Sequence, residues 1–230
     1  MAKIHLGILI IIFSLFAFLR FYNLGFSEYI PDETTVVTPV KKHQSLSREF
    51  LEYQRKEPIQ FLLAGTVSLF NVPITNEFVY RVPFALASIF GLLFAYLAVL
   101  EISKNKAVAT VAVLLLGING FLVAFGRIVQ YQSFNLLFSC AGLYFYAKSL
   151  RLDLNNKSKL INITAGLLYM FLSLSSHWDV IFFLPIYSYV FIKFFHINKD
   201  KKLRIRFLLI HLAVFIFLVL PFVWIYLNTF

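Results

Sequence analysis

The chain is poor in cysteine and in charged residues, and both shortages limit what it can be. Cys140 is the single cysteine among 230 residues, which excludes an intrachain disulfide and leaves the redox compartment open. Only 14% of the residues are charged, whereas a soluble domain carries about a quarter. With 60% hydrophobic residues and a mean hydropathy of +0.80, the composition predicts a helical membrane protein.

Acidic residues are scarce as well. The chain has 11 Asp and Glu against 21 Lys and Arg, a formal net charge of +10. Such a charge could suggest nucleic acid. The basic residues, however, stand in short loops between apolar stretches, where they would hold helices against an anionic membrane surface. We therefore expect a lipid bilayer as the partner and no nucleic acid.

Several motifs of soluble enzymes are missing. The sequence contains no glycine-rich phosphate loop, Walker motif, zinc-ligand spacing or nucleophile elbow. Chemistry on ATP or on a soluble nucleotide sugar is therefore unsupported. No cofactor can be named with certainty; a divalent cation bound by carboxylates stays open, and its ligands are unknown.

What the chain does have is a series of long apolar stretches. About 20 residues of helix cross a bilayer, so these stretches predict an all-α integral membrane protein of about seven transmembrane helices. Asn119 and His211 lie within them, and we interpret both as packing residues, the asparagine bonding between helices. The stretches are His5–Asn23, Val82–Leu100, Ala107–Phe125, Ile128–Ala147, Leu160–Ser176, Val180–Phe195 and Phe207–Asn228.

The basic residues predict the orientation of these helices. Thirteen of the 21 fall on one side of the membrane if the helices alternate, at Lys3, Lys104, Lys106, Lys148, Arg151, Lys157, Lys159, Lys193, Lys199, Lys201, Lys202, Arg204 and Arg206. Positive loops remain cytoplasmic. We therefore expect a multi-pass protein of the plasma (inner) membrane with a cytoplasmic N-terminus and with residues 24–80 as a long first extracytoplasmic loop.

This first loop is the main region outside the membrane. Seven of the eleven acidic residues fall between Glu28 and Glu77. Residues 45–53 resemble a helix start, and the apolar residues 58–70 are too short to span comfortably, so we expect them to form a helix lying in the interface. An acid-rich loop beside interfacial helices suits an active site, although a solvated loop has the same composition.

The pair Asp32-Glu33 follows Pro31, which should stiffen a turn and present both carboxylates at the membrane surface. A carboxylate there could act as a general base toward a hydroxyl or an amine, or bind a divalent cation. A solvated acidic turn is the alternative.

Four other residues could carry chemistry. His177 and Asp179 flank Trp178 in a tight hairpin at membrane depth, where ionisable residues are often functional; Asp179 could equally cap the next helix. Arg127 is the lone basic residue of the short outer loops, so it could bind a phosphate or pair with a neighbouring acid. Arg81 opens the second apolar stretch and is ambiguous in the same way.

With these residues in view, the chain resembles the N-terminal part of a GT-C fold glycosyltransferase. It is most similar to the superfamily of protein O-mannosyltransferases and aminoarabinose transferases (glycosyltransferase family 39-like). The stretches that carry the resemblance occur in family order: LRFYNLG at 19–25, PDE at 31–33, EPIQFLLAG at 57–65, NEFVYRVPFALASIFGLL at 76–93, FGRIVQYQSFNLLF at 125–138 and SSHWDVIFFLP at 175–185.

The resemblance implies a single transmembrane catalytic module over residues 1–230. Asp32 would be the catalytic base and Glu33 its partner. The expected substrate-binding residues are Arg127, His177, Asp179, Arg81 and Lys56. Two departures stand out. Many members carry an aspartate soon after the arginine, and residues 128–133 have none; members are also usually longer, so we expect the module to be incomplete at its C-terminus.

The implied reaction moves a sugar from a polyprenyl-phosphate donor to a glycan, lipid or protein acceptor at the extracytoplasmic face. Two alternatives stay open. The chain could be a non-catalytic membrane protein, either a transporter of lipids or solutes or an assembly partner, or it could be an inactive transferase fragment. A transporter should carry charges or broken helices at mid-membrane depth.

Overall fold

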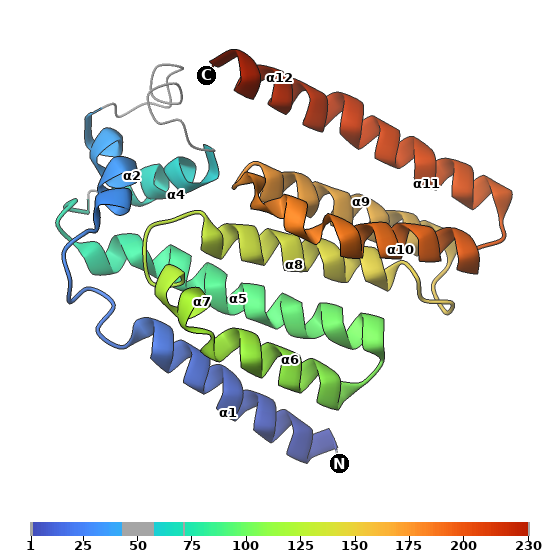
Figure 1. Cartoon of the computed structure of the whole chain (residues 1–230), viewed down its shortest axis with the longest axis horizontal. Helices are drawn as coiled ribbons and strands as arrows, with labels where there is room; N and C mark the ends of the chain where they lie inside the picture. Colours follow the sequence, from blue (N-terminus) through green and yellow to red (C-terminus); the bar gives the residue numbers. More distant parts are fainter. Residues whose placement is uncertain (1, 43–57, 71, 230) are drawn as a thin grey trace.

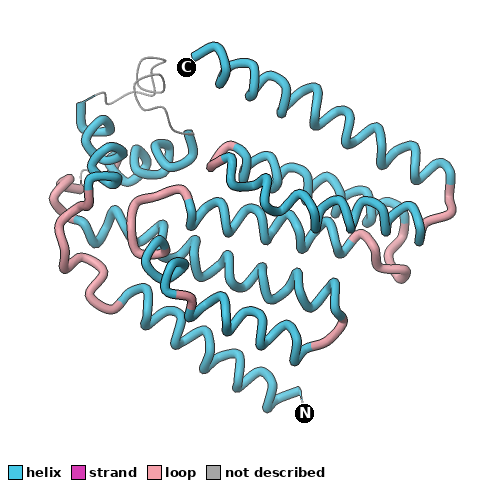
Figure 2. The backbone as a smooth tube through the Cα atoms, viewed as in Figure 1, coloured by secondary structure: helices cyan, strands magenta, loops and turns pink. Residues whose placement is uncertain are grey.

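The computed structural model describes residues 2–42, 58–70 and 72–229, and within these ranges the chain is helical, with no strand (Figures 1 and 2). The elements in chain order are α1 (Ala2–Phe21), α2 (Pro31–Lys42), α4 (Pro58–Ser68), α5 (Glu77–Ser103), α6 (Lys106–Ile118), α7 (Gly120–Phe125), α8 (Gln132–Lys148), α9 (Asn156–Leu174), the 3-10 helix η1 (Trp178–Phe183), α10 (Leu184–Ile197), α11 (Lys201–Val214), the π-helical turn η2 (Phe215–Val219) and α12 (Leu220–Thr229).

The prediction of an α-helical membrane protein is confirmed. Four helical segments among the described residues are long and apolar enough to cross a bilayer: Ile4–Phe21, Glu77–Ser103, Trp178–Ile197 and Lys201–Trp224. The number seven stays a prediction, because α6 has 13 residues and α8 has 17, fewer than the roughly 20 that a bilayer core requires.

Two of the predicted stretches differ from the helices observed. Residues 107–125 do not form one helix, because the backbone leaves the helical conformation at Asn119 (φ −59°, ψ 122°) and restarts as α7. The Asn119 side chain accepts a hydrogen bond from the backbone N–H of Leu122 (3.2 Å), so it caps α7. The expected bond to another helix is not found within the described ranges. The stretch expected from Ile128 begins as helix only at Gln132.

The centre of the bundle is the pairing of α5, α8 and α9. Figure 1 shows α5 and α8 side by side, with α6 and α1 beyond α5 and with α9 and α10 beyond α8. Gly142 of α8 and Gly166 of α9 allow the close approach. A Cβ on Gly166 would lie 2.9 Å from Cβ of Tyr146 and 3.0 Å from the Gly142 carbonyl oxygen. Small residues play this role in membrane helix pairs.

The run from α11 through η2 to α12 lies along one edge of the bundle, against α9 (Figure 1). His211 of α11 bonds the hydroxyl of Tyr146 on α8 through Nε2 (2.7 Å) and lies 2.7 Å through Nδ1 from the Phe207 carbonyl oxygen. Its interpretation as a packing histidine is confirmed.

Successive helices place the connecting segments at two ends of the bundle. One end, here the Glu33 end, carries α2, α4, the start of α5, residues 126–131 and residues 175–178; the other, the basic end, carries the N-terminus and residues 104–105, 149–155 and 198–200 (Figure 1). Lys104, Lys106, Arg151 and Lys199 all lie at the basic end. The segregation of charge expected from the sequence therefore exists along the bundle, and which end is cytoplasmic stays a prediction.

Candidate functional site at the Glu33 end

The acidic pair does not lie in a turn, as the sequence suggested, but begins helix α2. Pro31 is its first residue, a position where proline loses no hydrogen bond. The Glu33 carboxylate accepts a bond from the backbone N–H of Ile30 (3.1 Å), which closes the helix start as in a capping box. Both acids lie in the first turn, where the helix dipole favours negative charge.

Glu33 is held by Arg81 of α5. The guanidinium donates from Nε to Oε1 (2.9 Å) and from Nη2 to Oε2 (2.7 Å), and both side chains are buried. The backbone N–H of Val129, in the turn before α8, also donates to Oε1 (2.9 Å). Four hydrogen bonds therefore converge on one carboxylate, from three separate parts of the chain.

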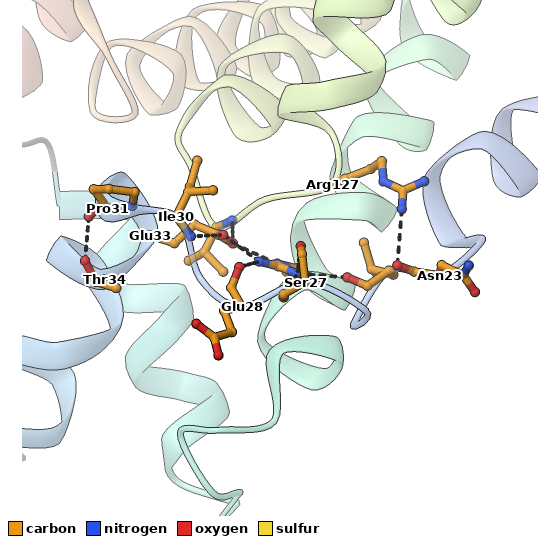
Figure 3. Close-up of polar contacts among 11 residues, drawn as sticks. Asn23, Ser27, Glu28, Ile30, Pro31, Glu33, Thr34 and Arg127 are labelled. Carbon is orange, nitrogen blue, oxygen red and sulfur yellow. Dashed lines mark hydrogen bonds and ion pairs between the residues drawn. The ribbon is translucent and has the colours of Figure 1, made fainter.

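All five N–H groups of Arg81 are engaged. Besides Glu33, the guanidinium donates to the backbone oxygens of Leu24 (3.0 Å), Ser27 (2.9 Å) and Glu28 (3.0 Å). Figure 3 shows Ser27, Glu28 and Glu33 gathered around this set of contacts. Arg81 thus fixes the segment between α1 and α2 onto α5, and in this geometry none of its N–H groups is left for a phosphate.

The two carboxylates of the pair face different surroundings. Glu33 has 0% relative exposure, whereas Asp32, one position earlier in α2, is exposed. One residue turns a helix by about 100°, which is enough to move a side chain from the packed face to the open one. A base must reach the acceptor, and Asp32 is the member of the pair on the accessible face.

Tyr29 lies beside this ion pair, with the Arg81 guanidinium 5.4 Å from its ring centroid. Burial, followed by the carboxylates of Glu77 and Glu33, raises the pKa of its hydroxyl well above the usual value. That hydroxyl oxygen is buried without a hydrogen-bond partner among the described residues, as are Nε2 of Gln130 and Oε1 of Gln132. Such atoms are rare, because each costs about 1–3 kcal/mol unless a water or a ligand bonds it.

The sequence reasoning missed this polar turn. Val129, Gln130 and Gln132 fall in a predicted transmembrane stretch, yet the Val129 N–H binds Glu33, and both glutamines carry amide atoms with no partner in the part of the chain that the structure describes. The signal was present: three consecutive polar or amphipathic residues, Gln130-Tyr131-Gln132, interrupt the apolar run.

Arg127 lies at the same end but contacts α1. Its Nη1 donates to the Leu19 oxygen (2.8 Å), and its Nη2 donates to the oxygens of Tyr22 (2.7 Å) and Asn23 (3.3 Å). Figure 3 shows it directed toward Asn23, apart from the Glu33 contacts. It therefore caps the C-terminus of α1. It pairs with no acid among the described residues, and its Nε–H and one Nη1–H are free of partners there.

His177 and Asp179 form a small unit of their own. The His177 ring lies 3.0 Å through Nδ1 from Oδ1 of Asp179 and 3.2 Å from its backbone nitrogen, so His177, not Asp179, caps η1. The same ring stacks on Tyr131 with centroids 3.7 Å apart and planes 8° apart. Residues 129–131 therefore connect the two predicted groups: Val129 binds Glu33, and Tyr131 stacks on His177.

The remaining predicted residues are placed as follows. Lys56 lies outside the described residues. In the part of the chain that the structure describes, no three His, Cys, Asp or Glu side chains gather as metal ligands would. Arg20, at the end of α1, is an additional buried arginine: it donates to the Ser88 hydroxyl (2.8 Å) and the Gly117 oxygen (3.2 Å).

The comparisons with known proteins give a match to a family model. The family model described as dolichyl-phosphate-mannose-protein mannosyltransferase matches residues 10–230, nearly the whole chain. No curated protein and no solved structure matches the chain. The matched residues include α2, Arg81, Arg127 and the hairpin at His177. Because the match extends over far more than half of the sequence, the chain belongs to the dolichyl-phosphate-mannose-protein mannosyltransferase family.

Proposed function

We propose that this protein transfers a sugar from a polyprenyl-phosphate donor to an acceptor hydroxyl or amine at the extracytoplasmic membrane surface, with Asp32 as the base. The family is one of glycosyltransferases that use lipid-linked sugar donors. The observation that carries the residue assignment is the contrast within the acidic pair: Glu33 is buried in an ion pair, and Asp32 next to it is exposed.

The proposed reaction is a single displacement at the anomeric carbon. The acceptor oxygen or nitrogen attacks this carbon and gives its proton to the Asp32 carboxylate. The new bond to the sugar forms as the bond from the anomeric carbon to the phosphate oxygen breaks, and the lipid phosphate leaves with the electron pair. The configuration is inverted. Holding donor and acceptor in this geometry supplies much of the rate.

Glu33 acts in this proposal as a positioning residue. Its carboxylate is saturated by Arg81, Val129 and Ile30, so it fixes the first turn of α2 and thereby the direction of Asp32. Arg81 acts through Glu33 in the same way. This role differs from the substrate contact that the sequence suggested for Arg81, because its five N–H groups are already engaged.

Arg127 is the proposed ligand of the leaving phosphate. The two N–H groups that do not cap α1 remain available, and charge-assisted bonds to phosphate are among the strongest in proteins. His177 and Asp179, reached through Tyr131, are proposed to line the sugar side of the site. Lys56 remains a proposed contact of the donor. The Glu33 end would face outward, with the N-terminus cytoplasmic and about seven helices in the membrane.

The transport alternative receives less support. It requires charges at mid-membrane depth, whereas the buried charged side chains in the described ranges (Arg20, Glu33, Arg81, Glu101 and Lys159) all lie within a few residues of a helix end. Among the described residues, the break at Asn119 and the π-helical turn η2 within the Lys201–Trp224 segment are features it would predict. The break at Asn119 is capped by its own asparagine.

The test is sugar transfer in proteoliposomes with a panel of polyprenyl-phosphate sugars. Asp32→Asn should lower turnover by about 10²–10⁴-fold, the usual contribution of a general base, while membrane insertion stays intact. Glu28→Gln is the matched control, because it removes an exposed carboxylate from the same segment. Full activity of Asp32→Asn would exclude Asp32 as the base. No turnover of the unchanged chain with any donor would contradict the proposed activity.

A further inference from the structure

A pocket lies at the basic end of the bundle, opposite the Glu33 end. Its volume is about 680 Å³, and it is formed where α5 ends, where the 149–155 turn joins α8 to α9, and where α10 ends. Five charged side chains line it: Glu101, Lys104, Arg151, Asp153 and Lys193. None of them takes part in the site proposed above.

The base of this pocket is an ion cluster around Glu101. The Glu101 side chain is 5% exposed and is bonded by Lys104. Arg151 donates from Nε to both carboxylate oxygens, at 3.0 and 3.1 Å. This geometry uses only Nε of the guanidinium. Both Nη groups of Arg151 are without a partner among the described residues, and its side chain is 42% exposed.

The charged side chains of the pocket favour a ligand that carries a single negative charge. Lys193 supplies a third cation, and its ammonium donates one bond to the Tyr189 hydroxyl (2.9 Å), which leaves two N–H groups. Three cations stand against two carboxylates, Glu101 and Asp153, of which Glu101 is already paired twice. The lining therefore carries a net charge of about +1, which complements a phosphodiester monoanion.

The rest of the lining is apolar. Ile102, Leu150, Leu152 and Ile197 complete it, and Leu152 is 79% exposed although it lies in a loop at the end of the bundle. At the boundary of a membrane, such side chains can contact acyl chains while neighbouring cations contact head groups. A water-soluble anion would bind to the cations, but it would bury no apolar surface against these four side chains.

We propose that this pocket binds the head group of an anionic glycerophospholipid from the leaflet at the basic end of the bundle. The phosphate would lie between the Nη groups of Arg151 and the ammonium groups of Lys104 and Lys193, with the acyl chains against Ile102 and Ile197. The assignment is independent of the proposed sugar transfer, because it uses no residue of the Glu33 end.

The test measures lipid binding by native mass spectrometry of the full chain released from detergent. Phosphatidylglycerol should stay bound. Phosphatidylcholine with the same acyl chains has the same phosphate, but its choline cation is repelled by the net positive lining. It should therefore bind about tenfold more weakly, a difference of about 1.4 kcal/mol. Lys193→Gln should weaken phosphatidylglycerol binding by a similar factor. Lys193 has no carboxylate partner among the described residues, so this variant should fold, which an unchanged thermal unfolding midpoint would establish.

Lys157→Gln is the matched control. It removes the same charge from an exposed lysine at the same end of the bundle, outside the pocket, and should leave binding unchanged. Equal retention of both lipids, or equal loss of binding in the two lysine variants, would overturn the proposal, because attraction would then be general to the basic end. Displacement of the lipid by an equimolar amount of glycerol 3-phosphate would overturn the lipid assignment in favour of a soluble phosphate ester.

Discussion

The guanidinium of Arg81 donates two hydrogen bonds, of 2.9 and 2.7 Å, to the carboxylate of Glu33, which lies 48 positions earlier in the sequence. This pair fastens the first turn of α2 to the start of α5. It also separates the roles of Asp32 and Glu33, since a carboxylate that is buried in this ion pair cannot contact the substrate. The stability of the Glu33 end and the proposed chemistry at Asp32 can therefore be separated by mutation.

Glu33→Ala should unfold or loosen this end. The substitution leaves the buried Arg81 charge without its partner, a change that typically costs about 3–5 kcal/mol. We expect a lower thermal unfolding midpoint and faster proteolysis between α1 and α5. Glu28→Ala, at an exposed position nearby, should change neither. Equal behaviour of the two variants would mean that the ion pair does not hold the segment.

Arg81→Lys should be nearly as harmful although it keeps the charge. A lysine ammonium has three donors and no planar fork, so it cannot reproduce the two bonds to Glu33 together with those to Leu24, Ser27 and Glu28. Thermal unfolding of the lysine variant measures this geometric contribution. A midpoint equal to that of the unchanged protein would show that charge alone suffices.

Arg127→Gln tests the two roles assigned to this residue. Removing the cation from the C-terminus of α1 should cost about 0.3–1 kcal/mol of stability. Loss of a phosphate contact should in addition raise KM for the lipid donor by about tenfold, with a smaller rise in Arg127→Lys. An unchanged KM together with reduced stability would restrict Arg127 to capping α1.

The stack of His177 on Tyr131 links the hairpin before α10 to the turn before α8. His177→Ala should lower the stability of the protein by about 0.5–1.5 kcal/mol beyond the loss of buried area. His177→Phe keeps an aromatic ring and should recover most of this loss, although it removes the acceptor that caps η1. A double-mutant cycle with Tyr131→Leu isolates the stacking energy, and a coupling energy near zero would contradict the prediction.

Gly166→Ala tests the contact between α8 and α9. The added methyl group would lie 2.9 Å from Cβ of Tyr146 and 3.0 Å from the Gly142 oxygen, so the helices must separate, at a cost of about 1–3 kcal/mol. Gly7→Ala in α1 is the control, because nothing lies within 4 Å of the added atom. The thermal midpoint should fall only in the first variant; the same midpoint in both would show that the contact yields without strain.

The sequence by itself determined the class of the protein and selected the region of the proposed site. Apolar stretches of about 20 residues allow only helices in a bilayer, because each backbone polar group must be bonded within its own segment. The same reasoning found the segregation of basic residues and a helix over residues 58–70, which the structure has as Pro58–Ser68. It also selected Asp32, Glu33, Arg81 and Arg127, because charged residues beside apolar stretches are conspicuous.

Only the tertiary structure decided where each of these side chains lies and what it contacts. Asp32 and Glu33 are adjacent acids with the same local signal, and what buries one of them is Arg81 from α5 and the Val129 N–H from the turn before α8. Arg127 finds its carbonyl partners more than 100 positions away. Hydropathy measures only how apolar a segment of the chain is. A polar side chain, in contrast, can be buried only where a partner satisfies its hydrogen bonds. For these residues that partner comes from a distant part of the sequence, so the sequence pattern does not reveal it.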